Sequence, residues 1–278
     1  MLLKVKISDT DANTLGRFHF GNNWARFLHK LNDQQIREAE ACLRRMLEVD
    51  DLREKSFIDV GSGSGLSSLA ARRLSAKVFS FVRDPQSVVC TRSLKEQFFP
   101  EDPKWRITEG SILDAGWLRS LDQFDIVYAW GVLHHTGAMW KALANVDSLV
   151  RPGGKLFIAI YNDQGRISDF WRVIKRVYNH LPPGLRFIVT WPALVVLWGP
   201  TTIKDFLRGK PFSTWHTRAK SRGMSPWHDF IDWVGGYPFE VARPDTIVNF
   251  YEARGYRLQK LKTCGRGLGC NEFVFSKS

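Results

Sequence analysis

The sequence predicts an α/β protein with a doubly wound, mostly parallel sheet of seven strands and an inserted helical lid. Apolar strand candidates alternate with helical patterns from about residue 56 to residue 161, and this alternation is typical of a parallel sheet covered by helices. The alternation stops after Tyr161 and resumes at a helix near 244–254. The roughly 80 residues between these points are therefore expected to be an insertion into one domain.

The expected elements follow one another along the chain. Trp24, Phe27, Leu28 and Leu31 share one face of a short helix, and a capping-box pattern at 32–35 begins a second helix. The strand candidates are 56–60, 77–82, 105–109, 124–130, 155–161, 256–263 and 271–276, and the helices between the first five lie at about 65–75, 85–98 and 138–150. Residues 151–154, RPGG, are expected to form a turn before the fifth strand.

This order divides the chain into three parts. Residues 1–50 are expected to form an N-terminal helical cap, 51–161 and 243–278 the α/β core, and 162–242 the inserted lid. The chain has 278 residues, of which 44% are hydrophobic, so it can bury one substantial core.

Composition narrows the class of protein. Four scattered cysteines without a C-x-x-C pair indicate neither a disulfide framework nor a zinc site, and we expect no metal. The first residues, MLLKVK, lack the apolar run of a signal peptide, so we expect a cytoplasmic protein. The formal net charge of +12 favours an anionic partner.

A glycine-spaced turn joins the first strand to the helix that follows. Residues 57–66 read FIDVGSGSGL, and glycines there let backbone N–H groups approach a ligand closely at a helix N-terminus. The G-x-G-x-G spacing differs from the G-x-G-x-x-G of dinucleotide sites. Asp59 would repel a diphosphate and attract an ammonium group, so the turn indicates S-adenosylmethionine; an ordinary strand-to-helix turn is the alternative.

Two later motifs follow in order: FDIVYAWGVLHHT at 124–136 and VRPGGKLFI at 150–158. Together with the glycine turn, they resemble the class I S-adenosylmethionine-dependent methyltransferases from about Phe57 to Tyr161 and again at the closing helix and hairpin. The resemblance implies a Rossmann-like methyltransferase fold, S-adenosylmethionine as cofactor and enzymatic methyl transfer. The GVLHH sequence at 131–135 resembles small-molecule methylases, such as those acting on quinones.

The resemblance also implies positions for cofactor contacts. The glycine turn would surround the methionine moiety, residues after the third strand would lie near the adenine, and the end of the fourth strand would lie beneath the sulfonium. Residues 20–24 resemble a leader that covers the cofactor. The implied contacts are Trp24, Asp59, Gly61, Ser62, Gly63, Gly65, Ser111, Ile112, Trp130 and Gly131.

One position departs from the family pattern. The family usually ends its second strand with an acidic residue that holds the ribose hydroxyls, and the matching residue here is Val82. Asp84 is our candidate substitute. Weak cofactor binding, or a fold that has lost catalysis, is the alternative.

Candidate catalytic residues lie after the fourth and fifth strands, at the edge where open sheets bind ligands. We expect His135, and second His134, to accept a proton from the substrate, and Tyr161 to orient it. His228 and Asp229, in an aromatic part of the insertion, form a further candidate pair. Packing roles are the alternative for all five residues.

The segment 166–222 carries eleven Lys or Arg and two Asp, a net charge of +9. It also holds an apolar run, Phe187–Trp198, whose twelve residues fall short of the roughly 20 that span a bilayer. Three interpretations stay open: a lid at the membrane surface, an RNA-binding face, or a helical cap packed on the core. RNA is the least favoured, because aliphatic side chains do not stack on bases.

The sequence therefore predicts a cytoplasmic methyltransferase, with peripheral membrane contact left open. Its expected substrate is a small, apolar or lipid-linked metabolite that accepts the methyl group on a hydroxyl or a nitrogen. An RNA methyltransferase and a non-catalytic cofactor-binding module are the alternatives.

Overall fold

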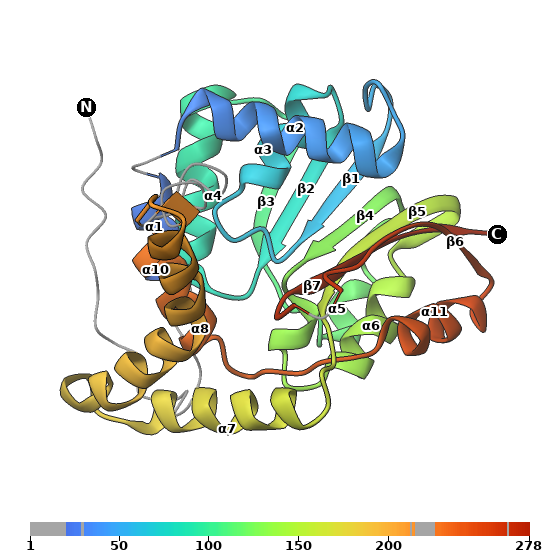
Figure 1. Cartoon of the computed structure of the whole chain (residues 1–278). Coiled ribbons are helices and arrows are strands. Elements are labelled where there is room, and N and C mark those ends of the chain that lie inside the picture. Colours follow the sequence, from blue (N-terminus) through green and yellow to red (C-terminus); the bar gives the residue numbers. More distant parts are fainter. Residues whose placement is uncertain (1–20, 29–30, 212, 215–225, 266) are drawn as a thin grey trace.

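A computed structural model describes residues 21–28, 31–211, 213–214, 226–265 and 267–278, without the side chains of several residues in the first helix and in the last helix of the insertion. Its centre is one seven-stranded sheet with the strand order β3-β2-β1-β4-β5-β7-β6 (Figure 1). The strands are β1 (Ser56–Val60), β2 (Lys77–Val82), β3 (Trp105–Glu109), β4 (Phe124–Trp130), β5 (Val150–Tyr161), β6 (Tyr256–Lys262) and β7 (Cys270–Lys277). The first five are parallel, and β7 runs antiparallel to β5 and β6, which confirms the predicted fold class.

Helices cover both faces of the sheet. Figure 1 shows α2 (Asp33–Leu47), α3 (Leu66–Arg73) and α4 (Pro85–Phe98) on one face, with α5 (Ala115–Leu118), α6 (Met139–Asp147) and α11 (Pro244–Glu252) on the other. Each face has its own apolar cluster, with Leu43, Leu69 and Phe57 in one and Leu143, Ile247 and Ile158 in the other. Because α2 packs in the first cluster, it is a layer of the core and not a separate cap.

Local sequence signals explain several helix starts. Asn32 and Gln35 form the predicted capping box, with bonds of 3.0 and 2.9 Å between each side chain and the other residue's backbone N–H. Asp84 caps α4, whose first residue is Pro85. Proline suits this position because the first N–H of a helix has no partner within it.

The start of the fifth strand is a correction. The sequence predicts a turn at 151–154, but β5 already begins at Val150. Phe124 pairs with Val150 and Ile126 pairs with Lys155, so the RPGG residues form an irregularity inside the strand. Gly153, with φ at 72°, provides the left-handed backbone that such a bulge requires.

The insertion is helical and has its own small core. Its described elements include α7 (Arg166–His180), a 3-10 turn at Pro183–Leu185, α8 (Phe187–Leu207) and α10 (Pro226–Gly235). Trp171, Val189, Ala193, Trp198 and Phe230 pack together in it. Its two ends meet where Ala242 donates to the carbonyl of Tyr161 (3.0 Å) and accepts from Asp163 N–H (3.2 Å).

The length of α8 is a second correction. The apolar run has twelve residues, but the helix has 21 and continues through Pro192 and Pro200. Within the described part of the chain, α8 alone is long and apolar enough to cross a membrane, judged by length and composition.

Candidate active site

The glycine turn lies at the carboxyl end of β1, beside the position where the strand order reverses. Gly61 and Ser62 N–H donate to the carbonyl of Phe81 at 2.7 and 3.2 Å, which fixes the turn against β2. Gly61 and Gly65 have φ of 76° and 85°, a region that residues with a Cβ rarely adopt. A Cβ at Gly61 would lie 2.6 Å from Val132, and one at Gly65 would lie 2.9 Å from Thr91. The turn is therefore a narrow cradle that only glycine permits.

The first helix covers this turn. In α1 (Gly21–Leu28), the indole of Trp24 lies so close to Gly63 that a Cβ there would be 3.0 Å from the ring. A Cβ at Gly21 would lie 2.3 Å from a carboxylate oxygen of Asp84. The structure thus brings Trp24, Gly63 and Asp84 together, although they come from three separate segments.

Asp59 and Ser62 lie within the support of the turn. The Asp59 carboxyl group is 2% exposed and accepts a 2.5 Å hydrogen bond from Ser68 Oγ, and Ser68 in turn contacts Ser80 Oγ at 2.7 Å. Burial raises the pKa of Asp59 to about 7, against the effect of the Ser68 bond. Ser62 Oγ lies 3.0 Å from Thr91 Oγ1. Both side chains are buried and support the turn through these hydrogen bonds, so neither is exposed to a ligand.

Asp84 is already engaged as a helix cap. One carboxylate oxygen accepts from Ser87 N–H (3.1 Å) and Ser87 Oγ (2.6 Å), and the other accepts a longer bond from Gln86 N–H (3.4 Å). The second oxygen has the weaker bond and therefore the greater remaining capacity. Val82 ends β2 and is half-buried, with a side chain that offers no acceptor.

Two further segments complete the edge of the sheet. Ser111 accepts from Leu113 N–H, and the carbonyl of the buried Ile112 accepts from Asn145 at 2.7 Å, so both residues lie in the loop after β3. Trp130 ends β4 and is 43% exposed. Gly131 has φ of 74°, and a Cβ there would have nothing within 4 Å. The space beside Gly131 is therefore open, at the end of β4.

His135 is held by the insertion. Its Nδ1 lies 2.6 Å from the carbonyl oxygen of Pro238. A carbonyl only accepts hydrogen bonds, so we assign the ring proton to Nδ1, which leaves the lone pair on Nε2. Burial lowers the pKa of His135 to about 4, against the Pro238 bond and together with the charge of Lys175. The ring is therefore a neutral proton acceptor at physiological pH.

His134 has a different environment. It is completely buried, and its ring nitrogens make no hydrogen bond of normal geometry to the described residues. Burial, the neighbouring His135 and the charge of Lys175 hold its pKa well below the usual value. A group without solvent access does not contact a substrate in this conformation, so His134 packs the site and His135 faces it.

Tyr161 links these histidines to the insertion. Its ring centroid lies 4.1 Å from His134, 5.5 Å from His135 and 5.2 Å from Phe239. The buried Lys175 lies over the same group, with Nζ 4.8 Å from the Phe239 ring and 6.0 Å from the Tyr161 ring. This aromatic cluster joins the two histidines to the insertion.

Two important groups escaped sequence reasoning. Glu240 accepts from Met139 N–H with both carboxylate oxygens (3.1 and 3.0 Å), and so caps α6 from 101 residues away. Its own N–H donates to the carbonyl of His134 at 3.0 Å. Pro238 acts through its backbone carbonyl, for which a sequence carries no signal.

The second candidate pair, His228 and Asp229, lies in α10, but its side chains fall outside the described residues. Among the residues that the structure describes, no group of three or more His, Cys, Asp or Glu is arranged to hold a metal.

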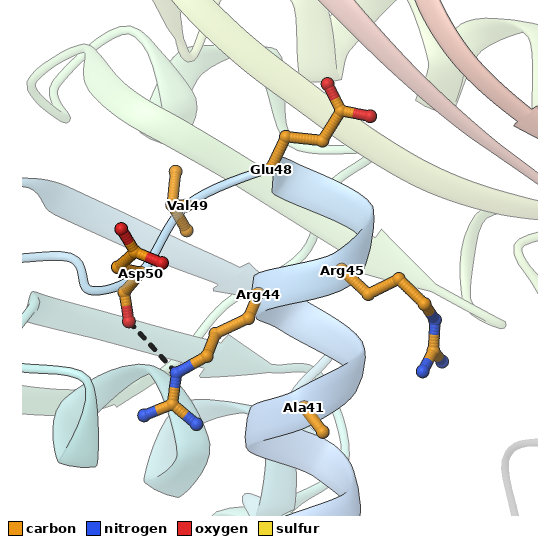
Figure 2. Close-up of a pocket in the computed structure, with 6 residues that line it drawn as sticks. All are labelled: Ala41, Arg44, Arg45, Glu48, Val49 and Asp50. Atoms are coloured by element: carbon orange, nitrogen blue, oxygen red, sulfur yellow. Dashed lines mark hydrogen bonds between the residues drawn. The ribbon is translucent and has the colours of Figure 1, made fainter.

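A separate hollow of about 490 Å³ lies at the end of α2 (Figure 2). It is lined by Ala41, Arg44, Arg45, Glu48, Val49 and Asp50. Arg44 Nε donates to the carbonyl of Asp50 at 2.9 Å across it. These residues precede β1, whereas the glycine turn follows it, so the hollow lies at the opposite edge of the sheet from the candidate site.

The arrangement can now be compared with known proteins. Residues 27–257 match the family model described as "Methyltransferase domain". A ubiquinone biosynthesis O-methyltransferase of Parvibaculum lavamentivorans is 31% identical over 175 residues, which cover 57% of this chain and 66% of the relative. A ribosomal protein L11 methyltransferase of Photobacterium profundum is 32% identical over 128 residues, 42% of this chain and 37% of the relative. The chain thus spans less than two thirds of each relative.

Solved structures agree on the fold. Magnesium protoporphyrin IX methyltransferase from Synechocystis PCC 6803, solved with bound SAH, aligns with a TM-score of 0.53 at 13% identity. The alignment covers 95% of this chain and 90% of that one.

Proposed function

This chain belongs to the methyltransferase-domain family and is an S-adenosylmethionine-dependent methyltransferase, and we propose that its acceptor is a small, apolar or lipid-linked metabolite with a hydroxyl or nitrogen nucleophile. The observation that carries the proposal is His135, a neutral histidine in the turn that follows β4, whose ring is oriented by the Pro238 carbonyl. The relative named for ubiquinone biosynthesis supports an apolar acceptor.

The residues around the glycine turn fit the cofactor. Gly61, Gly63 and Gly65 hold the turn in a left-handed backbone conformation, and the N-terminus of α3 directly follows them. Trp24 would cover the bound molecule, Asp84 would reach its ribose, and Ser111 and Ile112 would border its adenine. S-adenosylmethionine supplies an electrophilic methyl group on a cationic sulfur.

The acceptor side supplies the base and the walls. When the acceptor oxygen takes the methyl group, the bond between that carbon and the donor sulfur would break, and the acceptor's proton would pass to Nε2 of His135, which would then carry a proton on both ring nitrogens. The Pro238 carbonyl stabilises this cation, since it raises the pKa of the ring. The partly buried Tyr161 would present aromatic surface to an apolar acceptor, and the buried Phe239 supports its ring from behind.

The test offers the purified full chain methyl-labelled S-adenosylmethionine with a panel of acceptors. A prenylated dihydroxybenzene in detergent should be methylated, and total RNA should not. His135→Gln should lower turnover by about 10²–10⁴, the usual loss for a general base. Cofactor affinity, measured by calorimetry, should stay within about twofold.

His180→Gln is the matched control, because His180 Nδ1 also lies 2.7 Å from a backbone carbonyl, that of Arg176, on the exposed part of α7. It should retain full turnover. Full turnover in His135→Gln would contradict the assigned base. Methylation of RNA alone would favour an RNA methyltransferase, for which the basic insertion is the supporting observation. Cofactor binding without methylation of any acceptor would favour the non-catalytic module.

A further inference from the structure

The outer surface of the insertion is apolar to an unusual degree. On α7, Ile167, Phe170, Val173 and Val177 are each more than 40% exposed. They recur every three or four residues, so they share one side of the helix, next to the buried Trp171 and Tyr178. α7 therefore has one broad apolar side, of which only a part is packed.

α8 also combines packed and exposed apolar residues. Val189 and Ala193 pack in the insertion's core, while Trp191 and Val195 are 59% and 65% exposed on the other side. Near its end, Phe206 and Leu207 are 73% and 82% exposed. Figure 1 shows α7 and α8 at the lower left of the molecule, outside the layers that cover the sheet. Exposed apolar surface that continues over two helices marks an interaction site.

Positive charge borders these apolar sides. Arg166 and Arg176 lie on α7, and Lys204, Arg208 and Lys210 lie at or after the end of α8, all exposed. Asp169, the one acidic residue on α7, is already paired with Arg172. Long cationic side chains beside an apolar helix face suit a surface that is apolar inside and anionic outside.

We propose that the exposed apolar sides of α7 and α8, which we call the α7–α8 face, dock this protein on the surface of an anionic lipid bilayer. The apolar side chains enter the interface, and the bordering Lys and Arg contact phosphate groups. α8 lies in the interface and does not span it, because Val189, Ala193 and Trp198 are committed to the core of the insertion. The docking surface is separate from the methyl-transfer site and stands whether or not the proposed acceptor is correct.

Vesicle flotation of the full chain tests the proposal. Vesicles of phosphatidylcholine alone are compared with vesicles that contain roughly a third anionic phospholipid. The protein should float with the anionic vesicles at 0.1 M salt, where the Debye length is about 10 Å, and bind several-fold less at 1 M, where it is about 3 Å. Failure to float under every condition would overturn the proposal.

Two sets of variants separate the contributions. Trp191→Gln with Val195→Gln should lower binding to anionic vesicles by about tenfold or more, because both side chains lose their apolar burial. Lys204→Gln with Arg208→Gln should lower binding to anionic vesicles several-fold and make it less sensitive to salt. Val89→Gln with Leu261→Gln is the matched control, since these residues are 41% and 39% exposed elsewhere on the molecule. Equal losses in control and test variants would contradict a specific face.

The remaining outcomes identify other occupants. If the Trp191 and Val195 changes convert a dimer to a monomer in light scattering and leave flotation intact, the face contacts a second copy and the proposal is wrong. If the bound protein resists alkaline extraction, α8 spans the bilayer and interfacial docking is wrong. Turnover on a water-soluble acceptor should be unchanged in all three double variants, which shows that each has folded.

Discussion

The two sides of the candidate site are built in different ways. The cofactor side consists of short core segments around the glycine turn, fixed by backbone bonds such as that from Gly61 to Phe81. The acceptor side joins residues about 100 positions apart, such as His135 with Pro238 and Met139 with Glu240. Close packing therefore defines the first side, and a few polar contacts to an insertion define the second. A single substitution at the glycine turn should therefore weaken cofactor binding. Turnover should depend instead on the contacts that fix the insertion to the core.

The largest expected effect tests close packing at the glycine turn. Gly61→Val should weaken cofactor binding by roughly 100-fold or more, because the new side chain would meet Val132 and strain a positive-φ backbone. Gly153→Val is the control, since Gly153 has nearly the same φ, 72° against 76°, but nothing within 4 Å of its Cβ. Calorimetry and thermal melts compare the two. Equal losses of affinity would show that backbone strain alone matters.

The second largest effect tests the contact between the insertion and α6, which is made by Glu240. Glu240→Ala removes the carboxylate that caps α6, so we expect a loss of about 1 kcal/mol in the free energy of unfolding. Turnover should fall roughly tenfold because His135 loses its fixed position. Glu240→Gln keeps an acceptor oxygen and should recover most of both. Unchanged turnover in the Ala variant would mean that Pro238 holds His135 by itself.

The pH dependence tests the state of His135. Its pKa of about 4 keeps the ring neutral, so kcat/KM should stay nearly constant from pH 7 down to about 5. An ordinary histidine, with a pKa near 6.5, would already lose roughly tenfold at pH 5.5. An acid limb centred at 6.5 would contradict the assignment.

The same lowered pKa has a consequence for folding. The unfolded chain binds the proton first as the pH falls, so the free energy of unfolding should decrease from about pH 6.5 toward pH 4. His135→Gln should make this decrease shallower in denaturant titrations.

The smallest effect tests Asp84 on the cofactor side. Asp84→Asn keeps a good N-cap for α4 but removes the negative charge. Cofactor affinity should fall about threefold to tenfold with little change in the melting temperature, since hydrogen bonds to charged groups are the stronger ones. Asp84→Ala, which also loses the cap, should reduce both. Unchanged affinity in Asp84→Asn would show that Asp84 does not hold the ribose, so that the acidic residue missing at Val82 has no substitute there.

The contrast between the two sides also explains what the sequence could predict. The first four strands match their predicted bounds, because short segments rich in apolar and aromatic residues, such as 56–60, mark strands of a parallel sheet. The start of β5 could not be predicted, since Pro152 and Gly153 read as a turn and only pairing with β4 makes them part of a strand. The length of α8 was missed because the apolar run ends at Trp198, while the helix continues to Leu207 through a mostly exposed segment that contains Pro200.

The candidate site divides along the same line. The glycine turn is a contiguous motif, so its residues could be named from the sequence. His135 could also be named, from its place after β4. Its orientation could not, because the partner is the backbone carbonyl of Pro238, and every residue, proline included, carries such a carbonyl. The burial of His134 and of Asp59 likewise depends on neighbours far away in the sequence.

The closure between Tyr161, Asp163 and Ala242 has a consequence for how such a protein can change over generations. Two backbone hydrogen bonds hold both ends of the insertion together. The ends of the core segments before and after it are therefore as close in space as if a short loop joined them. The cost of closing a chain grows only slowly with its length. Segments of other lengths and surfaces can therefore be exchanged at this junction while the register of β5 and β7 stays the same. The part of the molecule that meets the acceptor is thus free to diversify without disturbing the part that holds the methyl donor.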